Sequence, residues 1–231
     1  MAGLKKNLNN LKKETYYSRE VLGRDLKSSV RGETAIQAIG DIKHGMEFFG
    51  FTKGQFSMID VIIHILNQTG PADVSIITWS AADADIRAAH SFLENGNIRK
   101  CRFLVDYSFK SRKPEILAKI VDLFGDDAVR ISSVHAKSVL IQNEDWNFFI
   151  RTSMNLNFNP RFENFEISEG FEFADWMRTV FDEIWNDRTA AECLSSNPGK
   201  DKAAFRKFQN ESGTEKVEVK RSPYDIFKRS K

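Results

Sequence analysis

The feature that most constrains the fold is an alternation of short apolar runs with amphipathic segments between residues 58 and 187. Strands are predicted at ADVSIITWS, KCRFLVDYSF, AVRISSVHAKSVLIQ and NFFIRTSMNL, the third of these being one extended strand or two. Helices are predicted at SMIDVIIHILNQTG, AADADIRAAHSFLENG, PEILAKIVDLFG and FADWMRTVFDEIWND, because their apolar residues recur at helical spacing. This alternation predicts an α/β protein in which helices cover a mixed sheet.

Outside this alternation the chain is more polar, which indicates extensions around one domain. At 231 residues the chain has the length of a single domain of ordinary size with additions. We expect a basic, helical N-terminal extension over 1–54, the main domain over 55–190 and a basic, flexible C-terminal tail over 191–231. Within the extension, 34–48 is expected to be helical and FFGFTKGQ to form a turn or short strand.

Basic residues are concentrated at the two ends of the chain. Residues 1–31 hold eight Lys and Arg against three Asp and Glu, and residues 200–231 hold ten against five. Residues 32–199 carry 16 basic and 24 acidic side chains. Because Lys and Arg neutralise phosphates whatever the sequence, these ends favour a polyanionic partner. Terminal segments that simply remain solvated would give the same pattern.

The remaining composition narrows the setting of the protein. No apolar run approaches the roughly 18–20 residues that span a bilayer, and the N-terminus lacks the apolar core of a secretory signal. Cys101 and Cys193 do not form the spaced pattern of a disulfide framework or a zinc site. We therefore expect a cytoplasmic protein with no membrane association, no bound metal and no cofactor.

Four polar residues interrupt the apolar strands of HAKSVLIQNEDWNFFIRTSMN, residues 135–155. His135 and Lys137 are one residue apart, as are Ser153 and Asn155, and side chains alternate between faces along a strand. Each pair is therefore expected on one face, where these donors suit a phosphate and a neutral imidazole supplies a nucleophile. No carboxylates stand beside them at metal-ligand spacing, which favours metal-independent phosphoryl chemistry. The alternative is an ordinary sheet with a few satisfied polar groups, which are costly to bury without partners.

The order of these residues resembles the HKD motif of the phospholipase D superfamily. His-x-Lys at 135–137 is followed by Ser-x-Asn at 153–155 and by Glu163-Asn164, and the resemblance extends over about residues 55–187. It implies a phospholipase D-like fold, a mixed sheet flanked by helices. Two positions depart from the family pattern, since Gln142 stands where the family has Asp and Thr152 where it has Gly. Nearby Glu144 or Asp145 replaces that Asp only if the turn shifts its register.

The resemblance also implies a role for each residue. His135 would attack phosphorus and become a phosphohistidine. Lys137 and Asn155 would hold the non-bridging oxygens, and Ser153 would donate a further hydrogen bond. Glu163 would accept a hydrogen bond from a histidine ring nitrogen and fix its orientation.

This scheme needs a second histidine to protonate the leaving oxygen and to activate water. His44, His64 and His90 have no Lys two residues later, so the chain holds a single motif. Members of the superfamily with one motif place their site on the two-fold axis of a homodimer. We therefore expect a C2 homodimer in which both copies of His135 face one phosphate.

The resemblance to small single-motif members makes a nuclease acting on DNA or RNA the expected function. The basic residues expected to contact the nucleic acid are Arg99, Lys100, Lys110, Arg112, Lys113 and Arg151, with Arg102 in the same basic stretch. Two alternatives stay open. One is a catalytically degenerate phospholipase D-like module that binds nucleic acid or protein. The other is a phospholipase or phosphatidyltransferase, for which a second motif and a membrane-binding segment would be usual.

Overall fold

The computed structural model describes residues 23–28 and 34–186, and all structural statements concern these residues. They lie within one of the two compact units into which the chain divides, residues 11–194. The predicted C-terminal tail and most of the basic N-terminal residues lie outside the described part. None of the helices in the described ranges is long and apolar enough to cross a membrane.

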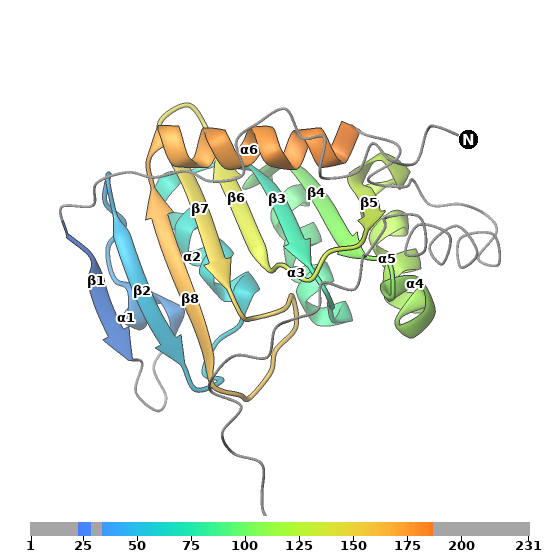
Figure 1. Cartoon of the computed structure of the whole chain (residues 1–231), viewed down its shortest axis with the longest axis horizontal. Coiled ribbons are helices and arrows are strands. Elements are labelled where there is room, and N and C mark those ends of the chain that lie inside the picture. Colours follow the sequence, from blue (N-terminus) through green and yellow to red (C-terminus); the bar gives the residue numbers. More distant parts are fainter. Residues whose placement is uncertain (1–22, 29–33, 187–231) are drawn as a thin grey trace, which may run out of the picture. The chain divides into compact units, whose positions relative to one another are not determined.

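An eight-stranded mixed sheet forms the centre of the described residues, as the alternation in the sequence predicts (Figure 1). The strand order is β1-β2-β8-β7-β6-β3-β4-β5. The strands are β1 (Asp25–Ser28), β2 (Glu47–Thr52), β3 (Ala72–Thr78), β4 (Ile98–Asp106), β5 (Val129–Ser132), β6 (Ser138–Gln142), β7 (Asn147–Thr152) and β8 (Glu163–Glu169). Strands β3, β4 and β5 are parallel, whereas β6, β7 and β8 pair antiparallel with their neighbours.

These directions bring several strand ends to one edge of the sheet. β3 ends there at Thr78, β4 at Asp106 and β7 at Thr152, while β6 begins there at Ser138 and β8 at Glu163. We call this the lower edge, as it lies in Figure 1, and the other the upper edge. The segments that follow β3, β4 and β7 and those that precede β6 and β8 therefore lie at the lower edge, where the parallel strands β3, β4 and β5 have their carboxyl ends.

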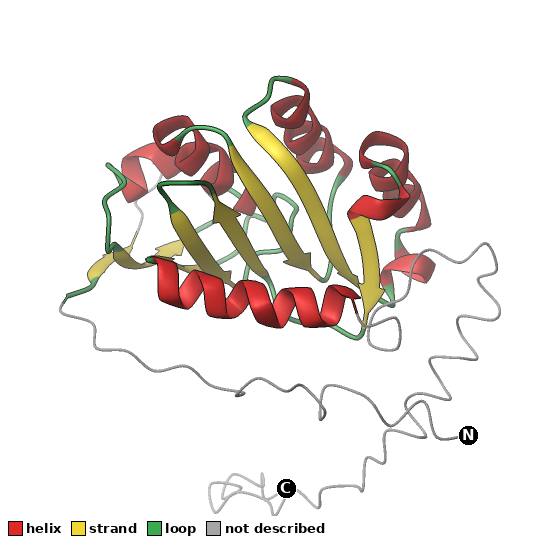
Figure 2. Ribbon diagram, turned by 90° about the horizontal axis from the view of Figure 1, so that it is seen from above, coloured by secondary structure: helices red, strands yellow, loops and turns green. Residues whose placement is uncertain are grey.

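Helices cover both faces of the sheet, and Figure 2 shows α6 on one face and the other long helices on the opposite one. The helices are α1 (Ala35–Ile39), α2 (Met58–Thr69), α3 (Asp83–Glu94), α4 (Phe109–Arg112), α5 (Pro114–Phe124), a 3₁₀ turn η2 (Asp126–Ala128) and α6 (Phe171–Asn186). Phe181 of α6 packs with Leu104 and Phe149 on one face. The larger apolar core fills the other face, under α2, α3 and α5.

Local chemistry explains where these helices begin and end. At the start of α2, the Ser57 N–H donates to the Asp60 carboxylate over 2.7 Å, which satisfies one of the free N–H groups of a helix start. Gly70 ends α2 with a φ of 82°, a conformation that glycine adopts without steric cost. Pro114 occupies the first turn of α5, where its missing N–H costs nothing.

The predicted helix over 34–48 is wrong beyond its first turn. Helix α1 ends at Gly40, which has a φ of 75°, and Glu47–Thr52 form strand β2, paired with β8. Within β2, a β-carbon at Gly50 would lie 2.7 Å from the Phe48 ring and 2.8 Å from the Phe165 ring, so this position of the strand has room only for glycine. FFGFTKGQ thus contains a short strand, as predicted. Strands β1 and β2 belong to the same sheet as β8, so the predicted boundary at 54/55 falls inside this sheet.

Candidate functional site

The two predicted pairs of polar residues flank strands at the lower edge and do not lie on them. His135 and Lys137 belong to the segment between β5 and β6, while Ser153 and Asn155 follow β7. The expectation that strand alternation orients each pair is therefore wrong. The ladder between β3 and β6 begins at Ser138, so residues 133–137 have no neighbouring strand with which to pair. The stretch AVRISSVHAKSVLIQ, predicted as one extended strand or two, therefore forms two strands, β5 and β6.

His135 and Lys137 nevertheless contact each other. The Lys137 ammonium lies 3.4 Å from Nε2 of His135 and donates to the backbone oxygen of His135 over 2.9 Å. An ammonium only donates, so Nε2 accepts, which leaves the proton of a neutral imidazole on Nδ1. His135 is exposed and Lys137 is half-buried. The chain thus presents an imidazole with a lone pair on Nε2 at the surface, beside a cation.

The two segments are tied together across the ends of β6 and β7. The Thr152 N–H donates to the Lys137 oxygen over 3.1 Å, which brings Lys137 next to the start of the Ser153 segment. Burial lowers the pKa of the Lys137 ammonium, while the Glu163 and Asp106 carboxylates oppose that shift. Lys137 is therefore within electrostatic range of two carboxylates from different strands.

Ser153 and Glu163 form a hydrogen-bonded unit at the ends of β7 and β8. The Ser153 hydroxyl donates to the Glu163 carboxylate and accepts from the Asn164 N–H over 3.0 Å. Asn159 also donates to Glu163, over 3.4 Å. Within the described residues no histidine donates to Glu163, so the hydrogen bond expected by resemblance is not formed within this chain. The carboxylate instead fixes the hydroxyl of Ser153.

Asn155 lies in the segment that connects β7 to β8. This segment passes first beside the start of β8 and then beside the residues that follow β3. On one side of it the Ser153 N–H donates to the Asn164 oxygen, and on the other the Leu156 N–H donates to the Ser80 oxygen, each over 3.1 Å. The side-chain oxygen of Asn155 is buried and has no hydrogen-bond partner among the described residues. Because buried polar atoms normally have partners, this oxygen is a candidate contact for a bound group.

The two departures from the family pattern have clear local consequences. Gln142 lies at the upper end of β6, the end remote from Lys137, and its amide donates to Asn147 over 3.1 Å. Glu144 is also at the upper edge and pairs with Arg99 over 2.5 Å, so it does not replace the missing acid near His135. The Thr152 hydroxyl donates to the Asn164 oxygen over 2.7 Å. The side chain of Thr152 therefore connects the end of β7 to the start of β8.

Sequence reasoning missed a second group of residues at the lower edge, just after β3 and β4. The Arg112 guanidinium lies 3.6 Å from the centre of the Trp79 indole, and the His135 ring meets the same indole edge-on at 5.8 Å. Arg112 also donates to the Ser108 hydroxyl, and that hydroxyl donates to the Asp106 carboxylate. The sequence does contain one signal for these residues, which is their position at or just after the ends of two predicted strands. Ligands often bind at the carboxyl ends of parallel strands.

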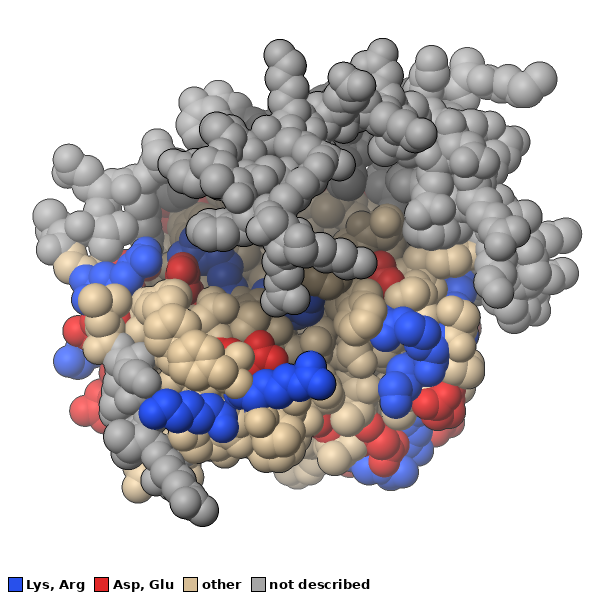
Figure 3. Space-filling model, turned by 60° about the horizontal axis from the view of Figure 1, so that its bottom comes forward, with Lys and Arg blue, Asp and Glu red and all other residues tan. Residues whose placement is uncertain are grey.

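The basic residues predicted to contact nucleic acid do not all lie together. Lys110 and Arg112 are in α4 and Lys113 follows them, next to the end of β4 and thus at the lower edge. Figure 3, which turns the bottom of the molecule toward the viewer, shows separate groups of Lys and Arg side chains. Arg99 and Lys100 begin β4 at the upper edge. Arg151 is paired with Glu166 over 2.6 Å and faces Phe173 of α6.

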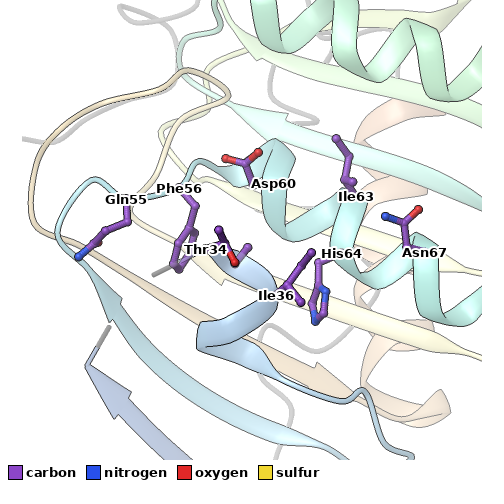
Figure 4. Close-up of a pocket in the computed structure, with 9 residues that line it drawn as sticks. Thr34, Ile36, Gln55, Phe56, Asp60, Ile63, His64 and Asn67 are labelled. Carbon is purple, nitrogen blue, oxygen red and sulfur yellow. The ribbon is translucent and has the colours of Figure 1, made fainter. Parts of the chain in front are cut away.

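A pocket of about 210 Å³ lies between α1 and α2, away from these residues (Figure 4). Its polar groups serve the fold, since Asp60 caps α2 and His64 lies 2.8 Å from the Gly40 oxygen. Within the described ranges no group of three or more His, Cys, Asp or Glu side chains is placed to hold a metal ion. The lower edge therefore remains the candidate site.

No protein family and no curated protein sequence matches the chain. A polyphosphate kinase from Porphyromonas gingivalis is similar over 59% of this chain and 25% of its own, at 12% identity and a TM-score of 0.44. TrmBL2, an archaeal chromatin protein described as having a novel mode of DNA binding, is similar over 67% of this chain and 56% of its own, at 10% identity and a TM-score of 0.44. This chain thus spans only part of each, and these partial overlaps do not assign it to a family.

Proposed function

We propose that the chain is a metal-independent phosphodiesterase of the phospholipase D type that hydrolyses nucleic-acid phosphodiester bonds. The observation that carries this proposal is the meeting of His135 and Lys137 at the lower edge, next to the Ser153–Glu163 unit. An accepting imidazole nitrogen, a cation and a fixed hydroxyl are the groups that nucleophilic attack on a phosphodiester needs.

In the first step, Nε2 of His135 attacks phosphorus. A phosphorus–nitrogen bond forms, and the bond from phosphorus to the leaving nucleotide oxygen breaks. Lys137 and the side-chain amide of Asn155 stabilise the charge that grows on the non-bridging oxygens. Ser153 keeps its hydroxyl oriented through Glu163.

His135 of a second copy of the chain donates its proton to the leaving oxygen. In the second step, the same imidazole takes a proton from water, and the water oxygen attacks phosphorus. The phosphorus–nitrogen bond breaks, and His135 of the first copy returns to its neutral form. Exposure of His135 at the surface supports this arrangement, because a second copy must reach the same phosphate.

Cleavage in the presence of EDTA tests the enzymatic proposal. We expect the full chain to cleave single- or double-stranded DNA or RNA in EDTA, and His135→Ala to reduce the rate by at least about 10⁴-fold. Loss of cleavage in EDTA that Mg²⁺ restores would contradict the metal-independent mechanism.

Subunit exchange tests the shared site. Light scattering should give the mass of a dimer at working concentrations. Addition of excess His135→Ala chain should lower the wild-type activity, because mixed dimers contain one histidine where two are needed. A monomeric active chain, or activity unaffected by the mutant chain, would exclude the two-histidine mechanism.

The 3.4 Å contact between Lys137 and Nε2 favours a second candidate, a binding module without turnover, because an ammonium occupies the nucleophilic lone pair. The same assay separates the two functions. Retained nucleic-acid binding without cleavage in any buffer would establish the binding module.

A further inference from the structure

We infer that Arg112, held against Trp79, binds a second phosphate of the substrate beside the one attacked by His135. The site then acts on nucleic-acid strands in preference to isolated phosphodiesters. This inference rests on the proposed function and adds to it the substrate class and the residue that selects it.

Arg112 is fixed in place although its side chain is exposed. Its guanidinium lies 3.6 Å from the centre of the Trp79 indole. Its Nη2 donates to the Trp79 oxygen over 3.1 Å and to the Ser108 hydroxyl over 2.8 Å, and its Nε donates to the same hydroxyl over 3.0 Å. Binding at this guanidinium therefore requires little ordering of a flexible side chain.

All of these acceptors are neutral, which leaves the charge of Arg112 available. No carboxylate among the described residues pairs with Arg112, and Asp106 reaches it only through the Ser108 hydroxyl. Both N–H groups of Nη1 lack an acceptor among the described residues, because the hydrogen bonds use Nε and Nη2. The two N–H groups of Nη1 point in different directions, so each can donate one hydrogen bond to a phosphate oxygen beside the positive charge.

The position of Arg112 relative to His135 fits a chain of phosphates. The indole of Trp79 contacts both, with Arg112 at 3.6 Å and the His135 ring at 5.8 Å from its centre. The two groups are therefore within about 10 Å of each other, so both can contact one short stretch of a nucleic-acid backbone. Lys137 lies 6.0 Å from the same indole, so the scissile phosphate and its neighbour would meet two separate cations.

The test compares Arg112→Gln, Arg112→Lys and a control, Arg87→Gln, on two substrates. Arg87 is a suitable control because it is an exposed arginine on α3 that pairs with Asp83. The substrates are a single-stranded oligonucleotide and bis(p-nitrophenyl) phosphate, which has one phosphate. For each variant, kcat/KM on the oligonucleotide is divided by kcat/KM on the small diester.

We expect this ratio to fall about tenfold in Arg112→Gln and less in Arg112→Lys, which keeps the charge but loses the planar stack. Arg87→Gln should leave the ratio unchanged. An equal loss on both substrates, or no loss on either, would overturn the inference. Arg112→Lys keeps the test valid if the glutamine variant does not fold.

A binding measurement separates failure of this inference from failure of the proposed function. The affinity for the oligonucleotide is measured by fluorescence anisotropy over a range of salt concentrations in wild type and Arg112→Gln. Loss of one phosphate contact should reduce the slope of log K against log salt by about one. If the wild-type chain binds without cleaving, a reduced slope still supports Arg112 as the phosphate contact, and an unchanged slope refutes it.

Discussion

The two edges of the sheet carry similar basic side chains, but within the described part of the chain those named at the upper edge are paired with carboxylates and those named at the lower edge are not. At the lower edge, Arg112 and Lys137 have no paired carboxylate among the described residues and rest on neutral acceptors. Toward the upper edge, Arg99 pairs with Glu144 over 2.5 Å and Arg102 pairs with Asp182 over 2.7 Å. Paired cations stabilise a structure, whereas unpaired ones leave a positive potential that attracts anions. This difference is the reason why we place the proposed site at the lower edge.

The upper edge also contains a pocket, which sharpens the contrast. It has a volume of about 400 Å³ and is lined by Arg99, Lys100, Arg102 and Arg130 together with Trp185. Arg102 and Arg130 both lie over the Trp185 ring, at 5.3 Å and 4.8 Å. Arg102 and Arg130 thus connect α6 to the sheet.

Among the predictions that test this comparison between the edges, the one with the largest expected effect concerns Lys137. Lys137→Met should lower kcat by about 10²-fold or more, because one donor to the developing charge is lost. Stability should not fall with it. Since burial lowers the pKa of Lys137, the folded chain bears the cost of the buried charge at every pH below that lowered pKa. That cost is relieved as the pH rises through the lowered pKa, and the methionine variant does not have it.

Rate measurements and urea denaturation at pH 7 check this prediction together. The wild-type rate should also fall on the alkaline side at a lower pH than the ordinary lysine value of 10.5. A variant that loses both activity and stability would show that Lys137 is a structural residue, and the contrast between the edges would then fail.

The second prediction concerns Arg102, the matching cation toward the upper edge. Arg102→Met should lower the free energy of unfolding by about 2 kcal/mol, because its hydrogen bond to a charged partner is lost and Asp182 is left partly buried. The ratio of oligonucleotide to small-diester cleavage should stay unchanged. A double-mutant cycle with Asp182→Asn measures the pair itself. A selective loss of oligonucleotide cleavage would instead assign a nucleic-acid contact to this edge.

The sequence predicted the regular parts of this fold well, for physical reasons that are local. Helix α2 has apolar residues at helical spacing and stops at Gly70, and α5 begins at Pro114. The helix predicted over 34–48 was wrong beyond Gly40, because the strand that follows is defined only by its pairing with β8. Pairing with a strand that lies more than 100 residues later leaves little trace in a local sequence pattern.

The candidate site was predicted only where its residues are close in sequence. His135 and Lys137 do meet, although the reason given was strand alternation and the actual arrangement is a segment outside the sheet. Trp79 and Ser108 were missed, because the parallel pairing of β3 and β4 brings together segments nearly 30 residues apart. A short sequence motif identifies the site residues of one segment. It does not identify residues of other segments that the order of strands in the sheet places beside them.

The smallest expected effect concerns Asp85, a buried carboxylate in α3 near the lower edge. It accepts from the Ser57 hydroxyl over 3.2 Å and has no basic partner among the described residues. Burial is the main cause that raises the pKa of Asp85, and nearby Asp60 raises it further. The folded chain therefore binds this proton more tightly than the unfolded chain, and this residue's contribution to stability falls as the pH rises from about 3.8 through the raised pKa.

In Asp85→Asn that contribution is absent. The difference in unfolding free energy between wild type and variant should decline over this pH range by less than about 1 kcal/mol, the size of one net hydrogen bond. It should then be constant at neutral pH. Chemical denaturation of both chains at several pH values measures this difference. A difference for Asp85 that rises with pH would mean that this buried carboxylate has a cationic partner, and the two edges would then differ less than their described contacts indicate.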